Sequence, residues 1–120
     1  MKKCLLFILG SILLTISACE YKFIDPIEVE LPDEPVSFSE QIEPIFQDKC
    51  ISCHSSISPI LTTGNAYDNL INGSYVDTIM PEQSTLYEKV NDGHPGGNET
   101  LNPTELALIL KWIQEGAKNN

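Results

Sequence analysis

Two cysteines and a histidine stand within five residues of one another near the middle of the chain. Cys50 and Cys53 are separated by two residues, and His54 follows the second cysteine directly. On a helical turn this spacing brings both sulfur atoms to one side, where they can add to the two vinyl groups at one edge of a porphyrin. The adjacent histidine can then supply the proximal nitrogen ligand to the iron. The motif is typical of covalent c-type haem attachment.

Three other kinds of site use part of this motif. A thioredoxin-type redox pair has the same cysteine spacing but lies in a βαβ setting, and we find no strand-rich pattern in this chain. A structural zinc site needs four ligands, and after Cys50, Cys53 and His54 only His94 is left to complete it. A local disulfide is the simplest structural alternative. We favour haem attachment over these three.

The N-terminus has the pattern of an export signal. Lys2 and Lys3 precede an apolar run over residues 5–16, and small residues follow at 17 and 18. The run is shorter than the ~20 apolar residues that a spanning helix needs. Ile16-Ser17-Ala18-Cys19 resembles a bacterial lipobox, with isoleucine where leucine is usual. This resemblance implies that residues 1–18 are a lipoprotein signal peptide and that Cys19 becomes an acylated N-terminus, anchored to a membrane by its acyl chains.

The lipoprotein interpretation accounts for every cysteine. The chain has four cysteines, of which Cys4 leaves with the signal peptide, Cys19 is acylated, and Cys50 and Cys53 hold the haem. The expected location is the cell envelope, with the haem domain in the periplasm or at the cell surface.

Charge limits the partners of the mature protein. Without residues 1–18, five lysines stand against 17 acidic residues, which gives a net charge of −12. Such an acidic surface excludes nucleic acid as a natural partner. It favours a redox partner protein with a basic docking face, although ordinary solubility explains the same charge.

The mature chain divides into a tether and one small domain. Residues 19–36 interleave acidic residues with Pro26, Pro32 and Pro35, a composition that predicts an extended linker. The alternation of Ile27, Val29 and Leu31 leaves a short edge strand as an alternative. Residues 37–120 show helical spacing of apolar residues and predict an all-α domain.

Four helices are expected in that domain. The first begins at Ser37 or Ser39 and ends around the cysteine motif, and Pro44 either occupies its first turn or bends it. The second covers residues 65–72, and the third begins after Ser84. The last has the clearest signals, because Asn102-Pro103-Thr104-Glu105 combines an N-cap, an N1 proline and a capping acid. An apolar stripe follows at Leu106, Ile109, Leu110 and Ile113.

Several short motifs together resemble the small mono-haem cytochrome c domains of bacterial exported proteins, including those found next to planctomycete-type cytochrome modules. The motifs are Phe38-Ser39, Ile42-Glu43-Pro44-Ile45-Phe46, Cys50-Ile51-Ser52-Cys53-His54, Ala66-Tyr67, Ser84-Thr85-Leu86-Tyr87 and Trp112-Ile113-Gln114-Glu115-Gly116-Ala117. The resemblance covers residues 37–118. It implies a class I cytochrome c-like bundle of three to five short helices around one covalent haem c.

The sixth iron ligand is where the sequence departs from that family. Its distal ligand usually comes from a loop before the last helix, commonly a methionine followed by proline. Here His94-Pro95 stands in that loop, whereas Met80-Pro81 keeps the dipeptide at an earlier position. We expect His94 to be the distal ligand, with Met80 or an open site as alternatives. Two histidine ligands predict a lower reduction potential than a histidine and methionine pair.

The resemblance implies electron transfer through Fe(III)/Fe(II) cycling, without catalysis. The alternative is a haem sensor or a small-ligand-binding or peroxidase-type module with an open distal site. The sequence has no arginine and no further histidine to act as a distal acid or base. A third possibility is a lipoprotein without haem that only binds a partner.

Overall fold

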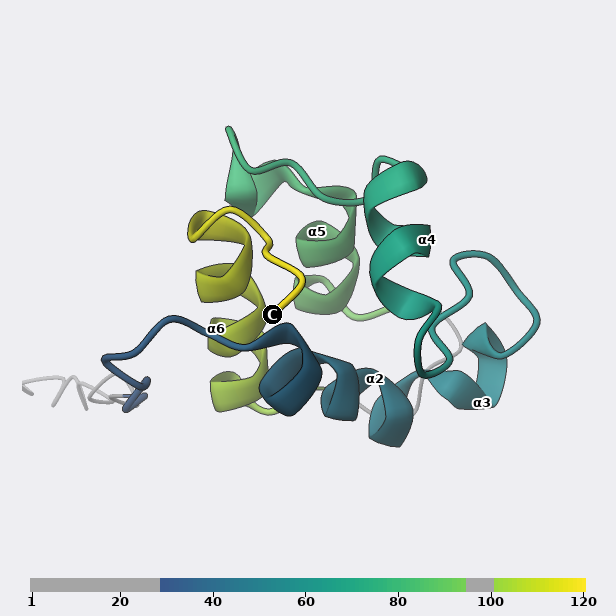
Figure 1. Ribbon diagram of the computed structural model, residues 1–120, viewed down its shortest axis with the longest axis horizontal. Helices are drawn as coiled ribbons and strands as arrows, with labels where there is room; N and C mark the ends of the chain where they lie inside the picture. The colour runs from purple at the N-terminus through teal and green to yellow at the C-terminus, as the bar shows by residue number, and fades with distance from the viewer. Residues whose placement is uncertain (1–28, 95–100) are drawn as a thin grey trace, which may run out of the picture.

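The computed structural model describes residues 29–94 and 101–120, and these residues form helices and no strands. The all-α prediction is therefore confirmed for the described part of the chain. In chain order the elements are η1 (Phe38–Ile42), α2 (Glu43–Lys49), α3 (Ile51–His54), α4 (Ala66–Asn72), η2 (Pro81–Gln83), α5 (Thr85–Asn91) and α6 (Pro103–Gln114). Figure 1 shows α5 between α4 and α6, with α2 running below them and α3 at the far end from α6.

Pro44 divides the first helical segment into two kinds of helix. Ser37 caps η1, a π-helical turn in which its hydroxyl accepts a hydrogen bond from the backbone N–H of Glu40. The regular helix α2 then begins at Glu43, with Pro44 in its first turn. Proline has no N–H to donate back to residue 40, and the wider π-helical turn accommodates that missing bond. Both expectations for Pro44 therefore hold in part: the α-helix starts beside it, and the preceding turn is irregular.

The last helix forms as its local signals predict. The Asn102 side chain accepts from the backbone N–H of Glu105 at 2.9 Å, and the Glu105 carboxylate accepts from the backbone N–H of Asn102 at 2.8 Å. These two bonds satisfy groups that the first turn of a helix otherwise leaves without partners. The helix ends before Gly116, whose φ of 96° favours glycine.

An aromatic cluster joins the two ends of the domain. The Trp112 ring lies 5.2 Å from that of Phe38 and 6.4 Å from that of Tyr67, measured between ring centroids. The indole N–H of Trp112 donates to the carbonyl of Lys118, and the Tyr67 hydroxyl donates to the carbonyl of Ala117. The buried apolar core around this cluster consists of Val36, Phe38, Ile42, Ile45, Phe46, Leu61, Ala66, Leu70, Leu86, Ile109, Trp112, Ile113 and Ala117. Trp112 is thus a core residue that covers the first helical segment.

The end of the expected linker is attached to the domain. The Lys111 ammonium donates to the carbonyls of Pro32 and Glu34, and the backbone N–H of Val36 donates to the Glu115 carboxylate at 2.8 Å. Val36 itself is buried in the core. Contacts with the last turns of α6 therefore extend into the expected linker as far as Pro32. Residues 29–31 are not a strand, so the described part of the linker lacks the alternative edge strand.

Asn120 forms hydrogen bonds with the start of the first helical segment. Its side-chain oxygen accepts from the backbone N–H of Phe38 at 3.0 Å, and its backbone oxygen accepts from the N–H of Ser39, also at 3.0 Å. The two segments at the ends of the described domain thus hold each other in place. Within residues 29–94 and 101–120, no helix is both long and apolar enough to cross a membrane.

Candidate haem site

Cys50, Cys53 and His54 lie on one helical turn. The backbone N–H groups of Cys53 and His54 both donate to the carbonyl of Cys50, at 3.2 and 2.9 Å. The thiols of Cys50 and Cys53 are free, with Cys50 half-buried against the core and Cys53 exposed. Helix α3 and the N-cap residue before it, Cys50, therefore present two unbridged thiols three residues apart, with the histidine next to the second one.

The ring of His54 is held in one orientation by backbone carbonyls. Its Nδ1 lies 2.9 Å from the carbonyl oxygen of Pro59 and 3.1 Å from that of Ile57. Carbonyl oxygens only accept hydrogen bonds, so Nδ1 must carry the proton and donate it. The neutral ring then has its lone pair on Nε2, which is the form that binds a metal. Hydrogen bonding at the second nitrogen is also what fixes most metal-binding histidines in proteins.

The loop after α3 brings these carbonyls to the ring. Residues 55–61 turn back on the motif, and the backbone N–H of Leu61 donates to the carbonyl of His54 at 2.8 Å. The peptide bond between Ser58 and Pro59 is cis. Sequence reasoning missed Pro59 and Ile57 because they act through backbone oxygens, which every residue has. The one available signal is Pro59 itself, since proline five residues after the histidine marks a turn.

The second histidine of the chain lies beside the first. His94 follows α5 after Gly93, whose φ of 80° turns the chain in a way that favours glycine. The rings of His54 and His94 have centroids 5.7 Å apart and planes inclined at 78°. This is an edge-to-face arrangement of neighbouring rings, so the two histidines belong to one site.

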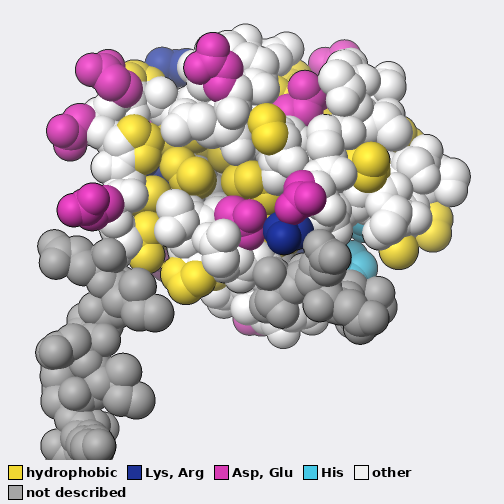
Figure 2. Space-filling view, turned by 90° about the horizontal axis from the view of Figure 1, so that it is seen from below, with side chains coloured by type: hydrophobic (Ala, Val, Ile, Leu, Met, Phe, Trp, Pro, Cys, Tyr) yellow, Lys and Arg dark blue, Asp and Glu magenta, His cyan; other side chains and the backbone are white. Residues whose placement is uncertain are grey.

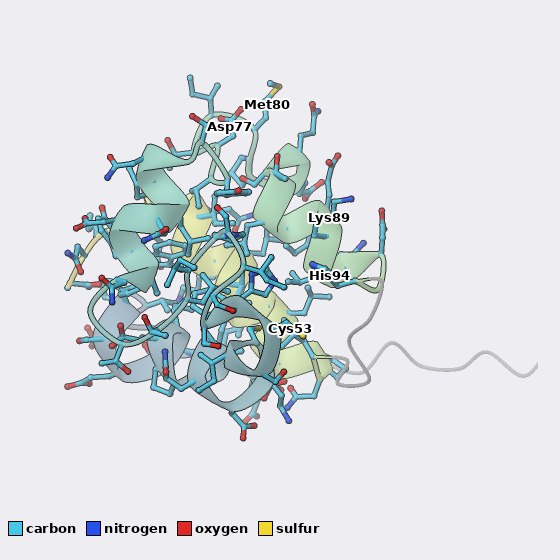
Figure 3. All side chains as sticks on the ribbon, turned by 90° about the vertical axis from the view of Figure 1, so that its right-hand side faces the viewer. Cys53, Asp77, Met80, Lys89 and His94 are labelled. Carbon is cyan, nitrogen blue, oxygen red and sulfur yellow. The ribbon has the colours of Figure 1, made fainter. Side chains whose placement is uncertain are left out.

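Figure 3 shows His94 close to Cys53 near the middle of the view and Met80 at the top, away from both. Met80 precedes η2, which Figure 1 also places away from α3. Met80 is 48% exposed and is not part of the buried core. The carboxylate of Asp77 accepts from the backbone N–H groups of Ile79 and Met80, which ties the Met80 backbone into its own loop. The structure brings His54 and His94 together and does not bring Met80 to them.

The two thiols differ in their surroundings. Burial raises the pKa of the Cys50 thiol from 9.0 to about 11, and the negative charge of Glu105 adds to this rise. Glu105 belongs to the first turn of α6, so that turn lies near the half-buried cysteine. Figure 2 shows the face of the molecule that lies underneath in Figure 1. On this face a histidine side chain lies next to hydrophobic side chains, and most of the acidic side chains lie away from the histidine.

The donor set of the site fits a c-type haem: two free thiols on one turn, a histidine with Nε2 available, and a second imidazole beside it. In the described ranges, no three histidine, cysteine, aspartate or glutamate side chains are grouped so that they could hold a metal ion by themselves. Cys4 and Cys19, with the predicted signal peptide and lipobox, lie outside the described residues.

Comparisons with known proteins add no relative, because no family model, curated protein or solved structure matches this chain.

Proposed function

We propose that this protein is an exported, membrane-anchored mono-haem c-type cytochrome that carries electrons. The observation that carries the proposal is the hydrogen bond from His54 Nδ1 to the Pro59 carbonyl, on the turn that also presents Cys50 and Cys53. A cysteine pair that served only as a disulfide would not require an adjacent imidazole oriented for metal binding. When bound, the haem supplies one-electron chemistry through its Fe(III) and Fe(II) states.

Each residue of the site then has one role. Cys50 and Cys53 would hold the haem through thioether bonds, and His54 would bind the iron through Nε2 while its Nδ1 stays bonded to the loop. His94 is the proposed distal ligand, supported by its ring position 5.7 Å from that of His54. With both His54 and His94 holding the group, the site would have no place for a substrate, which suits a carrier better than a catalyst.

Electron transfer also suits the surface of the protein. A cytochrome and its redox partner need only a small, transient interface. The net charge of −10, or −12 without residues 1–18, steers encounters toward a partner with a basic docking face. Cys19 would attach the domain to a bacterial membrane through its acyl chains, with residues 20–31 as a tether.

The test is an optical titration of protein made in a host with a haem-maturation system. We expect a low-spin spectrum in both oxidation states, reversible reduction, and no change when carbon monoxide is added to the reduced protein. A shift of the reduced spectrum with carbon monoxide would instead show an open distal site and favour a sensor or small-ligand-binding module.

Two variants serve as matched controls. Replacing Cys50 and Cys53 together with alanine should abolish the haem signal that survives denaturation on a gel. Replacing Cys19 with serine changes another cysteine of the same chain and should keep that signal, while the protein is released from the membrane fraction. Retention of covalent haem by the Cys50 and Cys53 double variant would refute the assignment of the thioethers.

A further inference from the structure

Two amide side chains hold the loop that orients His54. The Gln47 side chain, from α2, donates from Nε2 to the backbone carbonyl of Leu61 at 2.7 Å. The Asn69 side chain, from α4, accepts from the backbone N–H of Ile60 at 3.3 Å. Each amide thus binds the loop backbone one or two residues after Pro59, on which the His54 hydrogen bond depends.

The two contacts come from helices on different sides of the loop. Gln47 lies three residues before Cys50 on the helix that leads into the motif. Asn69 is itself fixed, because its side-chain nitrogen donates to the carbonyl of Asn65 at 3.0 Å. The loop is therefore attached to α2 and α4 by side chains with no other described role in the site.

We infer that Gln47 and Asn69 are positioning residues that set the strength of the His54 hydrogen bond and, through it, the reduction potential of the iron. This inference rests on the proposed haem function. A strong bond from Nδ1 makes the imidazole a more basic ligand, which favours the ferric state. Loosening the loop weakens that bond and should raise the potential.

The sharpest variant is Gln47→Met in the full haem-loaded chain. Methionine has a similar length and no charge, and it cannot donate to Leu61. Gln41→Met is the matched control, because Gln41 lies in the preceding turn, where it accepts a hydrogen bond from the backbone of Ser37. Asn69→Leu tests the second contact and keeps the experiment informative if Gln47→Met folds poorly.

Two measurements separate positioning from general destabilisation. The first is the reduction potential, which should rise in Gln47→Met and Asn69→Leu and stay at the wild-type value in Gln41→Met. The second is hydrogen exchange of the His54 Nδ1–H by NMR. It should be about fivefold faster in Gln47→Met, the factor that corresponds to losing one intramolecular hydrogen bond. Exchange of core amides such as that of Ile109 should not change.

The inference and the proposed function fail in different ways. If the wild-type chain takes up haem but the potential and the Nδ1–H exchange of Gln47→Met and Asn69→Leu match those of Gln41→Met, the positioning role is wrong. Equal acceleration of the Ile109 amide also overturns it, because the effect is then global. If no haem is attached to the wild type, the proposed function is wrong, while exchange at His54 in the apo-protein still tests the contacts of Gln47 and Asn69.

Discussion

Before haem is attached, Cys50 should react with an alkylating agent more slowly than Cys53. The pKa of Cys50 is raised from 9.0 to about 11, which lowers its thiolate fraction near neutral pH about 100-fold. A thiolate of higher pKa is also the stronger nucleophile. Over two pKa units its reaction rate rises about tenfold, which offsets part of the loss in thiolate fraction. The net expectation is alkylation about tenfold slower than that of an ordinary thiol, before any steric effect of its burial.

The assay is iodoacetamide labelling of full-length apo-protein in which Cys4 and Cys19 are serine, followed by mass spectrometry of the peptide with both cysteines. Cys53 is exposed and serves as the internal reference. We expect a rate ratio of Cys50 to Cys53 of about one tenth in the native protein. The ratio should approach one in guanidinium chloride, because unfolding removes the desolvation that is the main cause of the shift.

Glu105→Gln separates the two causes of the raised pKa. The variant removes the negative charge and should raise the native labelling ratio only in part, since desolvation is the larger cause. A native ratio near one in the unmodified sequence would refute the reasoning, because Cys50 would then be neither desolvated nor close to Glu105.

Three further predictions concern stability and ligation. The folded-state pKa of Cys50 lies above 9.0, so its contribution to apo-protein stability is full below about pH 9 and is lost as the pH rises through about 11. Urea unfolding across this range should show that loss, and Cys50→Ser should remove it. In the haem protein, His94→Ala should give a high-spin spectrum while Met80→Ala leaves it low-spin, and the opposite pattern would make Met80 the ligand. Asn102→Ala removes the cap bond to Glu105 and should cost about 1 kcal/mol, a fall in Tm of about 4–8 °C by calorimetry; an unchanged Tm would mean that the cap adds nothing.

Local signals were enough to predict the later α-helices of this domain, but they did not predict the short helix η2 or the π-helical form of η1. Asn102, Pro103 and Glu105 fix the start of α6 within four residues, and Gly116 fixes its end, so no distant contact is needed. The second helix, Ala66–Asn72, likewise begins and ends close to the expected residues, and the third, Thr85–Asn91, begins directly after Ser84 as expected. Helix ends are well predicted because capping satisfies backbone groups with residues nearby in sequence.

Features that depend on distant residues were not predictable. The bonds of Asn120 to Phe38 and Ser39 join positions about 80 residues apart, and the local sequence of neither segment indicates that they are in contact. The bond from the backbone N–H of Val36 to Glu115 is of the same kind, because the two residues are 79 positions apart in the sequence.

In the candidate site, too, the local features were predictable and the features set by distant contacts were not. The Cys50 to His54 motif is local, so its residues and spacing are evident from the sequence. The sequence could not show that the Pro59 carbonyl bonds to His54, because the path of the loop sets that contact. The choice between His94 and Met80 also depends on the fold, and the structure places only His94 beside His54.

The most direct test of the haem proposal is the mass of the peptide that contains residues 50–54, taken from protein secreted by a maturation-competent host. A peptide heavier by one haem, with both sulfurs in thioether bonds, is the predicted result. A peptide of unmodified mass, or one lighter by two hydrogens because Cys50 and Cys53 are bridged, would contradict the account.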